Sequence, residues 1–566
     1  MSNAGLAMCV AILAATVGLV VLLRPRRAST LDFYLAGQRV GVVTNACAIC
    51  GDYLSAASFL GVAAAVYAFG LDGVWYATGF TAGFVPVLLF VAAPLRRFGK
   101  FSLADFLGRR FDSEAVRLVA VGVVQLVVLS YLLPQAIASG LTWELLVGQG
   151  LAGLSPYATG VLFATVSVTG LVVVGGMRGA TWTQAVQFLF KLAALTWLAA
   201  AVLGGGFSYS RAVADLDAQP LANPQVVDGT SQLVIADNRL SDEDPTFAEP
   251  GARYGAAGQF ALVVTLMFGT AGLPHITNRY FTSPSGKAAR TTTVWVLGLA
   301  GAFYGLAVLL GVAARDLLPG AVPGRPWLAA LTTDGVLRVP EHALLALGRL
   351  VGGEIGLGVV ASGALLALMS TIAGLLLAAA ASLGHDVYER HLNPRATPSQ
   401  AVRAGRLATG VIALAATLPA LAVRPEALST VFPSFTATMV TWAFALAGSA
   451  LTPVVVLAIW WPRATAAGAA AGMLTGAVTA IGALVGGLTS GPGAGEVLLT
   501  PTFLAAPAAA LAVIGVSLRT QVPQGLDALW LRLHGTAADR RAERLALLTI
   551  RGVRVDAGAE AEAPAR

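Results

Sequence analysis

A group of polar residues interrupts an apolar run that extends from residue 41 to residue 69. The interruption reads GDYLSAASFLG and begins at Gly51. Its polar side chains are Asp52, Tyr53, Ser55 and Ser58. An acid at the centre of a membrane helix costs about 2.5–3.5 kcal/mol on insertion scales, so such an acid usually serves a function. We expect the group to bind an ion or a polar solute, although Asp52 could also simply cap a kinked helix.

A second interruption lies at the end of the apolar run 257–276, which closes with MFGTAGLPHI. Gly269, Gly272 and Pro274 follow one another closely there, and proline cannot donate a helical hydrogen bond. Each interruption falls in the first helix of a block, because a long polar loop precedes the second one. Two broken spans at matching positions are typical of transporters built from inverted repeats, whose sites lie at the breaks. Freed backbone amides attract anions there, and freed carbonyl oxygens attract cations.

Two adjacent hydroxyls, Ser370 and Thr371, lie in the otherwise apolar stretch 353–388. Each hydroxyl could bond back to its own helix. Na⁺ prefers oxygen ligands, as the hard cations Ca²⁺ and Mg²⁺ do. Two hydroxyl oxygens together with three backbone carbonyls would therefore suit a Na⁺ ion.

The composition is that of a membrane protein. Of the 566 residues, 57% are hydrophobic and 11% are charged, whereas about 25% charged residues are usual in soluble domains. Apolar segments of about 20 residues recur along the chain, which predicts an all-α, multi-pass membrane protein with about thirteen spans. The strand-like alternation of a membrane barrel is not found in the sequence. The predicted spans are 6–23, 41–69, 74–94, 117–140, 157–175, 183–204, 257–276, 293–313, 355–383, 404–423, 431–460, 465–487 and 500–518.

The distribution of basic residues predicts the orientation of these spans. With the amino terminus outside and the carboxyl end in the cytoplasm, most of the 36 Lys and Arg residues fall on the inner side, as the positive-inside rule expects. We therefore predict a multi-pass protein of a bacterial-type plasma membrane. In this topology the polar loop 205–256 lies outside, and the basic stretch 278–290 lies inside. The tail from residue 519 also lies inside and contains a candidate amphipathic helix near 536–550.

Several other classes of protein are disfavoured. The basic loops account for the net charge of +7, so no nucleic-acid partner is expected. The sequence contains no Walker A motif and no G-x-S-x-G serine elbow. Cys47 and Cys50 form a CxxC pair inside an apolar helix, with no second pair to complete a zinc site, and are expected to be reduced and buried. We predict neither an enzyme nor an organic cofactor, and no obligate protein partner is implied.

Four stretches together resemble a known family of transporters. They are GDYLSAASFLG, GGMRGATWTQAVQ (175–187), FGTAGLPHI (268–276) and LMSTIAG with the DVY that follows it. The resemblance is to the sodium:solute symporters, and within them to the cation–acetate and monocarboxylate permeases. It implies a LeuT-type core of five plus five inverted helices, with one extra helix before the core and two after it. The corresponding divisions are 1–30, 31–204, 205–256, 257–460, 461–518 and 519–566.

The same resemblance implies a sodium site between the first break and the eighth core helix. The implied ligands are the carbonyl oxygens of Gly51, Leu54 and Ala367 and the hydroxyls of Ser370 and Thr371. Many members of the family carry an acid in a W-T-D motif, where this chain reads W-T-Q with Gln184. The departure removes a negative charge near the cation path, which leaves open whether Na⁺ is the coupling ion or binds with lowered affinity.

Lys191 lies seven residues beyond Gln184, on the same face of the helix. Its ammonium could snorkel to a membrane interface. Alternatively it could balance Asp52 or attract a substrate carboxylate. A lysine that titrates here would permit coupling to H⁺ in place of Na⁺.

Taken together, the residues predict secondary active uptake of a short monocarboxylate such as acetate, propionate or pyruvate, coupled to Na⁺ or H⁺. The substrate-binding residues are predicted to be Asp52, Tyr53, Ser55, Ser58, Gly269, Thr270 and Gly272. Asp52 must then be paired, protonated or turned toward the cation. His275 is predicted at the inner end of its span, where it could serve an inner gate or simply lie at the interface. The alternatives are a symporter for another small solute, such as an amino acid or a vitamin, and a transporter-like membrane sensor.

Overall fold

The computed structural model describes residues 30–99, 101–227, 230–237, 240–423, 434–490, 494–521 and 525–535, with short pieces before residue 23. Within these residues nine helices are long and apolar enough to cross a membrane, and a bent pair of helices makes a tenth. Every predicted span from 41–69 onward overlaps helices of the described residues, so the predicted all-α membrane fold is confirmed. The first predicted span and the candidate tail helix lie largely or wholly outside the described residues, and the total of thirteen spans stays a prediction.

The first block of helices contains the first broken span. Its elements are α2 (Thr30–Leu35), η1 (Ala36–Gln38), α3 (Val42–Tyr53), η2 (Ala57–Gly61), α4 (Val62–Phe69), η3 (Gly70–Gly73), α5 (Val74–Ala82), α6 (Phe84–Pro86), η4 (Val87–Val91), α7 (Ala92–Phe98), α8 (Leu103–Arg110), α9 (Glu114–Val147) and α10 (Pro156–Gly204). Two predicted spans fall within α10, because the chain turns at Gly176 with φ 54° and ψ −159°. Glycine adopts a positive φ without steric cost, and a Cβ there would lie 2.7 Å from the Phe33 ring.

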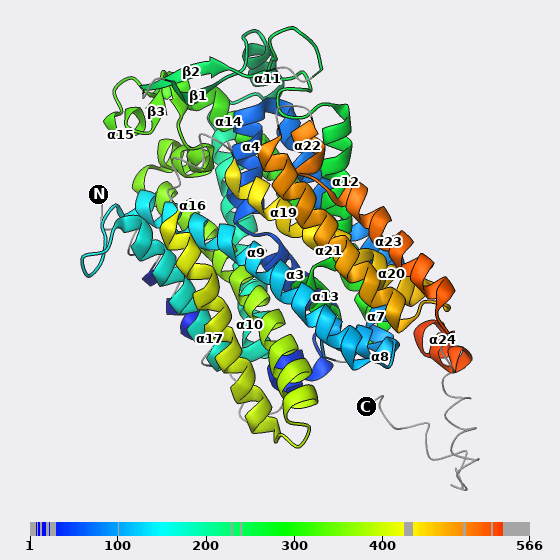
Figure 1. Ribbon diagram of the computed structural model, residues 1–566. Coiled ribbons are helices and arrows are strands. Elements are labelled where there is room, and N and C mark those ends of the chain that lie inside the picture. Colours follow the sequence, from blue (N-terminus) through cyan, green and yellow to red (C-terminus); the bar gives the residue numbers. More distant parts are fainter. Residues whose placement is uncertain are drawn as a thin grey trace, which may run out of the picture.

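The polar segment 205–256 contains short elements at one end of the bundle (Figure 1). They are α11 (Tyr209–Asp217), β1 (Ala222–Val227) and β2 (Thr230–Ile235). The two strands pair antiparallel, with Ala222 opposite Ile235. The sequence predicted only a loop here, because so short and polar a hairpin has no clear apolar alternation. The membrane part of the fold is nevertheless entirely helical among the described residues.

The second block begins with the second broken span. Its elements are α12 (Ala256–Gly272), α13 (Pro274–Tyr280), α14 (Gly286–Ala321), α15 (Pro326–Ala329), β3 (Thr332–Thr333), β4 (Val336–Leu337), η5 (Pro340–His342), α16 (Ala343–Ala381), η6 (Ser382–Leu392), α17 (Pro398–Ala422), α19 (Phe435–Ala450) and α20 (Thr452–Trp460). The remaining elements are α21 (Ala466–Thr489), α22 (Ala494–Leu498), α23 (Thr502–Arg519) and α24 (Leu526–His534). The short α24 was not predicted, and it lies at the end of the molecule opposite the hairpin (Figure 1).

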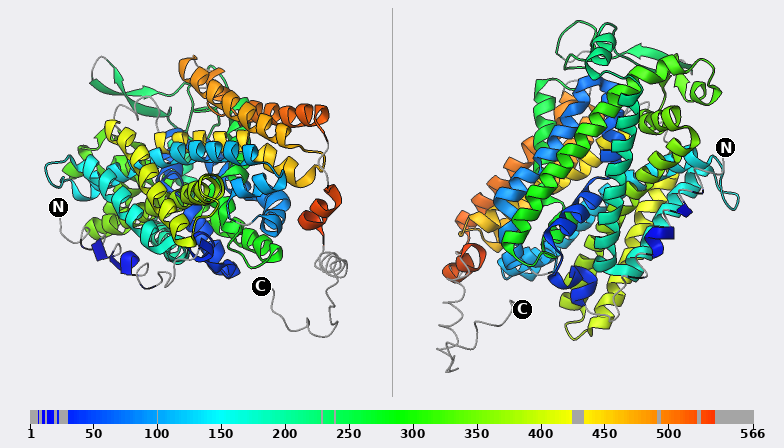
Figure 2. Two further views of the ribbon diagram at one scale, coloured as in Figure 1. Left: turned by 60° about the horizontal axis from the view of Figure 1, so that its bottom comes forward. Right: turned by 180° about the vertical axis from the view of Figure 1, so that it is seen from behind.

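The helices α3 and α16 occupy the centre of the bundle. α3 packs against α10, α14 and α16, and α16 also packs against α9 and α10. All residues of α3 from Asn45 to Tyr53 are buried, as is nearly all of α16 from Gly356 to Ala381. In contrast, α21 and α23 run along one side of the bundle (Figures 1 and 2). The polar side chains of α3 and α16 therefore face protein rather than lipid.

Hydroxyl side chains cap several of the long helices. In each case the hydroxyl accepts a hydrogen bond from the backbone amide three residues further on, which satisfies one of the free amides at a helix start. The capping residues are Ser102, Ser113, Ser155, Ser285, Thr397 and Thr465. The helices that start after the two breaks have no such local cap.

Candidate functional site

The first broken span is interrupted where the sequence predicts it. α3 ends at Tyr53, and Leu54 has the non-helical angles φ −78° and ψ 78°. The amide of Ser55 bonds the Tyr53 oxygen at 2.9 Å, and the amide of Ala56 bonds the Oε1 of Gln135 at 3.1 Å. The helical partners of the Gly51 and Asp52 carbonyl oxygens are thus directed elsewhere.

Hydroxyls of α16 reach these carbonyl oxygens. The Ser370 hydroxyl lies 2.5 Å from the Gly51 oxygen and 2.9 Å from the Ala367 oxygen. The Thr371 hydroxyl donates to the Asp52 oxygen at 2.6 Å. The two hydroxyls therefore bond across to α3 and are not confined to their own helix. The structure brings Gly51, Ala367 and Ser370 together, as the resemblance implied.

The Lys191 side chain enters the same group of oxygens. Its Nζ lies 2.9 Å from the Gly51 oxygen, 2.8 Å from the Leu54 oxygen and 3.3 Å from the Ser370 hydroxyl. The residue is completely buried, with 0% of its surface exposed. The expectation that Lys191 could snorkel to an interface is therefore wrong, because the side chain turns inward to backbone acceptors. Three of the five predicted Na⁺ ligands bind this ammonium.

Asp52 is paired with an arginine that the sequence analysis did not single out. The Nε of Arg279 lies 3.2 Å from Asp52 Oδ2, and both side chains are 0% exposed. Arg279 also donates to the Thr181 hydroxyl at 2.9 Å and to the Oε1 of Gln184. Gln184 in turn donates to the Ser370 carbonyl oxygen at 2.7 Å. Of the three options that the sequence analysis gives for Asp52, the structure shows the paired one.

The position of Arg279 corrects the predicted loop 278–290. α13 continues to Tyr280, so Arg279 lies on a buried helix and not in an exposed basic loop. The sequence places the end of the span before Arg279 because a charge that follows a proline commonly marks a helix end. Gly374 of α16 leaves space for the ion pair because it has no side chain. A Cβ at this position would lie 1.9 Å from Asp52 Oδ1.

The second broken span also bends where the sequence predicts it. α12 ends at Gly272, Leu273 has φ −63° and ψ 119°, and the two helix segments are bent by 49°. A Cβ at Gly269 would lie 2.5 Å from Phe444 Cβ, and one at Gly272 would lie 2.3 Å from the Ala447 oxygen. These glycines therefore allow α12 to approach α19 closely. Their predicted role in substrate binding stays a prediction.

Several predicted substrate donors already have protein partners. The Tyr53 hydroxyl lies 2.8 Å from both the Phe80 oxygen and the Thr270 hydroxyl. The Ser58 hydroxyl lies 2.7 Å from the Tyr304 hydroxyl. Tyr53 and Thr270 thereby connect the first broken span directly with the second.

Unpaired polar groups lie between the two breaks. His275 is 1% exposed, and neither ring nitrogen has a hydrogen-bond partner among the described residues. Its ring lies 5.4 Å from that of Tyr131, whose hydroxyl donates to Ser55 at 3.3 Å. Gln135, one turn beyond Tyr131, has an unpaired Nε2 within the described structure. His275 therefore lies within the bent span and not at its inner end as predicted.

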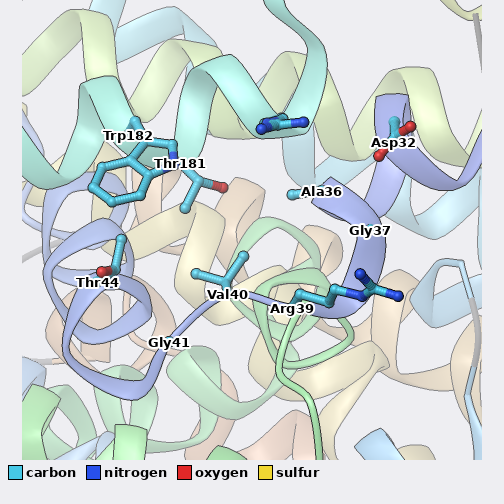
Figure 3. Close-up of a pocket in the computed structure, with 10 residues that line it drawn as sticks. Asp32, Ala36, Gly37, Arg39, Val40, Gly41, Thr44, Thr181 and Trp182 are labelled. Atoms are coloured by element: carbon cyan, nitrogen blue, oxygen red, sulfur yellow. The ribbon is translucent and has the colours of Figure 1, made fainter. Parts of the chain in front are cut away.

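A cavity of ≈ 460 Å³ opens beside the start of α3 (Figure 3). Thr181 and Trp182 of α10 line one wall, and Val40 and Thr44 line another. The remaining lining residues are Asp32, Ala36, Gly37, Arg39, Gly41 and Arg178. Thr181 connects this wall to the buried ion pair, because its hydroxyl accepts a hydrogen bond from Arg279. By the predicted orientation this cavity faces the cytoplasm.

The sequence signal for Tyr131, Gln135 and Thr181 is weaker. Gln135 follows Pro134 within an apolar span, which is the kind of feature that marks an irregular, functional helix. Tyr131 and Thr181 have no comparable mark, because single hydroxyls are common in membrane helices.

Two broken spans that meet around buried charged side chains and unpaired donors define a membrane transporter of the broken-helix class. Solved structures support this fold. The model superposes with a TM-score of 0.67 on a Na⁺-coupled sialic acid symporter, 17% identical, over 92% of this chain and 98% of that one. It superposes with a TM-score of 0.50 on Mhp1, a nucleobase-cation-symport-1 family transporter, 13% identical, over 90% of this chain and 100% of that one.

Sequence comparison identifies the family. The model of the sodium:solute symporter family matches residues 33–476. The uncharacterized symporter YwcA of Bacillus subtilis is 31% identical over 452 residues, which is 79% of each chain. A monocarboxylic acid transporter of Corynebacterium glutamicum is 31% identical over 455 residues, 78% of this chain and 76% of that one. The chain belongs to the sodium:solute symporter family, as the motifs predicted.

Proposed function

We propose that the protein carries a short-chain monocarboxylate, of the acetate, propionate or pyruvate type, into the cell by cation-coupled symport with alternating access. Membership of the family supports symport. The corynebacterial relative, described as a monocarboxylic acid transporter, supports the substrate class. The observation that carries the proposal is the presence of buried, unpaired donors between the two breaks. These are Gln135 Nε2 and the ring of His275.

A carboxylate would satisfy these donors. Leaving a buried polar group without a hydrogen-bond partner costs free energy, so such groups usually bind a ligand or an ordered water. A glutamine amide and a neutral imidazole can each donate to a carboxylate oxygen. The amide of Ala56 is already held by Gln135 Oε1, which fixes the orientation of the side chain and turns its Nε2 away.

The surroundings of these donors favour a small apolar acid. The Tyr131 ring lies 5.4 Å from His275 and 5.8 Å from Phe444. The Tyr53 ring lies 5.9 Å from Phe444 as well. Aromatic rings suit a methyl or ethyl group, whereas a sugar would require several more polar partners. The charges near the breaks also suit an anion, because Lys191 and Arg279 together exceed Asp52 by one positive charge.

The family bears on the identity of the coupling ion, and the charge balance bears on its stoichiometry. The family and its Na⁺-coupled structural neighbour favour Na⁺, and H⁺ is the alternative. One cation moving with one monocarboxylate is neutral, so the membrane potential does no work on that pair. The potential supplies about 2.3 kcal/mol per net charge per 100 mV. Current recordings during uptake therefore distinguish a neutral 1:1 cycle, which gives no current, from a cycle with an additional cation.

The cavity and the ion pair fit one step of alternating access. The substrate must pass from the breaks to the cavity, and the Arg279 cluster lies between them. We expect this cluster to separate when the site opens toward the cavity. Arg39 and Arg178 on the cavity wall would favour a departing anion.

The substrate class is tested by competition in proteoliposomes that contain the purified protein. Labelled acetate uptake should be inhibited by excess propionate and pyruvate, and not by amino acids or vitamins. If an amino acid or a vitamin inhibits uptake and the monocarboxylates do not, the proposed substrate class is wrong. The absence of uptake of any of these solutes would favour a sensor.

A further inference from the structure

The Lys191 ammonium binds three of the oxygens that the family resemblance assigns to Na⁺, those of Gly51, Leu54 and Ser370. We propose that Lys191 is a built-in competitor of Na⁺: the oxygens at the first break bind either the ammonium or Na⁺, and never both. The inference concerns the cation chemistry of this one site. It is tested without any carboxylate, so it stands or falls separately from the proposed substrate.

The contacts of Lys191 are complete for an ammonium. A lysine ammonium has three N–H donors and no acceptor, and Nζ has three acceptors within 3.3 Å. Two of these are the carbonyl oxygens of Gly51 and Leu54, and the third is the Ser370 hydroxyl. An ion of small radius would need the same oxygens at shorter distances, because hard cations bind oxygen well inside hydrogen-bond range. The two occupants therefore exclude each other sterically.

The local charges exclude double occupancy as well. Asp52 is the acid nearest these oxygens along the chain, and Arg279 already neutralises it. The position at which many family members carry an acid is the neutral Gln184, whose side chain is engaged by Arg279 and by the Ser370 oxygen. A Na⁺ beside the ammonium would place two like charges together in a buried site of low dielectric. Na⁺ can therefore bind only after Lys191 withdraws.

The competition predicts a specific gain of function. When Lys191 is replaced by methionine, the length of the side chain is nearly kept and its charge is removed. The three oxygens then lose their competing donor, while Thr371 and Ala367 remain in place. We expect purified Lys191→Met protein to bind ²²Na⁺ at least tenfold more tightly than the unmodified protein, in a scintillation proximity assay without carboxylate.

Two controls make the result specific to this site. Lys287 is exposed at the start of α14, and Lys287→Met should leave Na⁺ affinity unchanged. Adding Ser370→Ala to Lys191→Met should reduce the gained affinity, since it removes a proposed ligand. If Lys191→Met does not fold, Lys191→Gln keeps a polar neutral group and should change affinity in the same direction.

The result that overturns the proposal is equally clear. Lys191 and Na⁺ do not compete if Lys191→Met and Lys191→Gln bind Na⁺ no more tightly than the unmodified protein. The absence of Na⁺ binding by both variants would lead to the same conclusion. A gain that persists unchanged with Ser370→Ala would place the Na⁺ elsewhere and would also overturn it.

Discussion

The two broken spans differ in which backbone and side-chain groups they leave available. At the first break, the carbonyl oxygens of Gly51 and Leu54 face a lysine ammonium and a serine hydroxyl. At the second break, the imidazole of His275 has no partner among the described residues. The first break is thus arranged for a cation and the second contributes a donor suited to an anion. Under the proposed function, this difference would let one site hold a cation and an anion at separate positions.

The two breaks share one packing device. At each break, a glycine allows a neighbouring helix to approach more closely than a side chain would permit. A Cβ at Gly51 would lie 2.3 Å from the Gln184 oxygen, just as one at Gly272 would lie 2.3 Å from the Ala447 oxygen. The breaks therefore differ in chemistry while they resemble each other in construction.

The largest effect is expected from removing the arginine that links the two breaks. Arg279→Met leaves Asp52 buried without its partner, and breaking a buried ion pair costs about 3–5 kcal/mol. The thermal melting temperature in detergent should fall strongly and uptake should be lost. The exposed Arg290→Met is the matched control. If the double variant Asp52→Asn, Arg279→Met were as unstable as Arg279→Met, the ion pair would not be the cause.

The anion side of the comparison is tested at Gln135. Gln135→Leu removes the proposed donor to the carboxylate, and a hydrogen bond to a charged group is worth about 1.5–3 kcal/mol. We expect KM for acetate to rise about 10-fold or more, as measured by initial uptake rates in proteoliposomes. Gln149→Leu, at an exposed position, is the control. An unchanged KM would remove Gln135 from the substrate site.

The packing shared by the two breaks is tested at Gly51. Gly51→Ala forces the Gln184 backbone to move, and overpacking of this kind costs about 1–3 kcal/mol. We expect a lower melting temperature together with reduced uptake. Gly122→Ala in α9, where nothing lies within 4 Å of the added Cβ, should be tolerated. Equal stability of the two variants would contradict the close approach of α10 to the first break.

The smallest effect is expected at the hydroxyl contact between the breaks. Tyr53→Phe removes the hydrogen bonds to Thr270 and Phe80 but keeps the ring. A net loss of about 0.5–1.5 kcal/mol is typical of a neutral hydrogen bond. A double-mutant cycle with Thr270→Val, followed by thermal melting, should show coupling between the two residues. Strict additivity would mean that the two spans are not connected through this bond.

The sequence predicted those parts of the site whose residue types are unusual in an apolar membrane helix. Gly51, Pro274 and Ser370 were found because breaks and hydroxyls are conspicuous in apolar helices. Arg279 was missed because a charge after a proline indicates the end of a span, and only the fold shows that its partner Asp52 lies beside it. For Lys191 the sequence left snorkelling and inward roles open, and its carbonyl acceptors could not be predicted because Gly51 and Leu54 lie 140 and 137 residues away in the chain.

The same limit applies to the overall fold. Apolar length and basic loops predict the helical spans well, since each span is specified by its own residues. The hairpin β1–β2 and the short α24 depend on contacts with the rest of the molecule, and their own sequences carry no strong pattern. The LeuT-type fold that the family resemblance implied is confirmed by the superposition on solved symporter structures, whereas the exact number of spans stays a prediction.

The central claim is that a small carboxylate accumulates through the site between the two breaks at the expense of a cation gradient. The most direct measurement is the steady-state level of labelled acetate in proteoliposomes with and without an imposed Na⁺ or H⁺ gradient. The account predicts accumulation above the external concentration only when a cation gradient is present, and its loss in Gln135→Leu at low acetate. Mere equilibration of acetate under every gradient, or accumulation by Gln135→Leu equal to that of the unmodified protein, would contradict it.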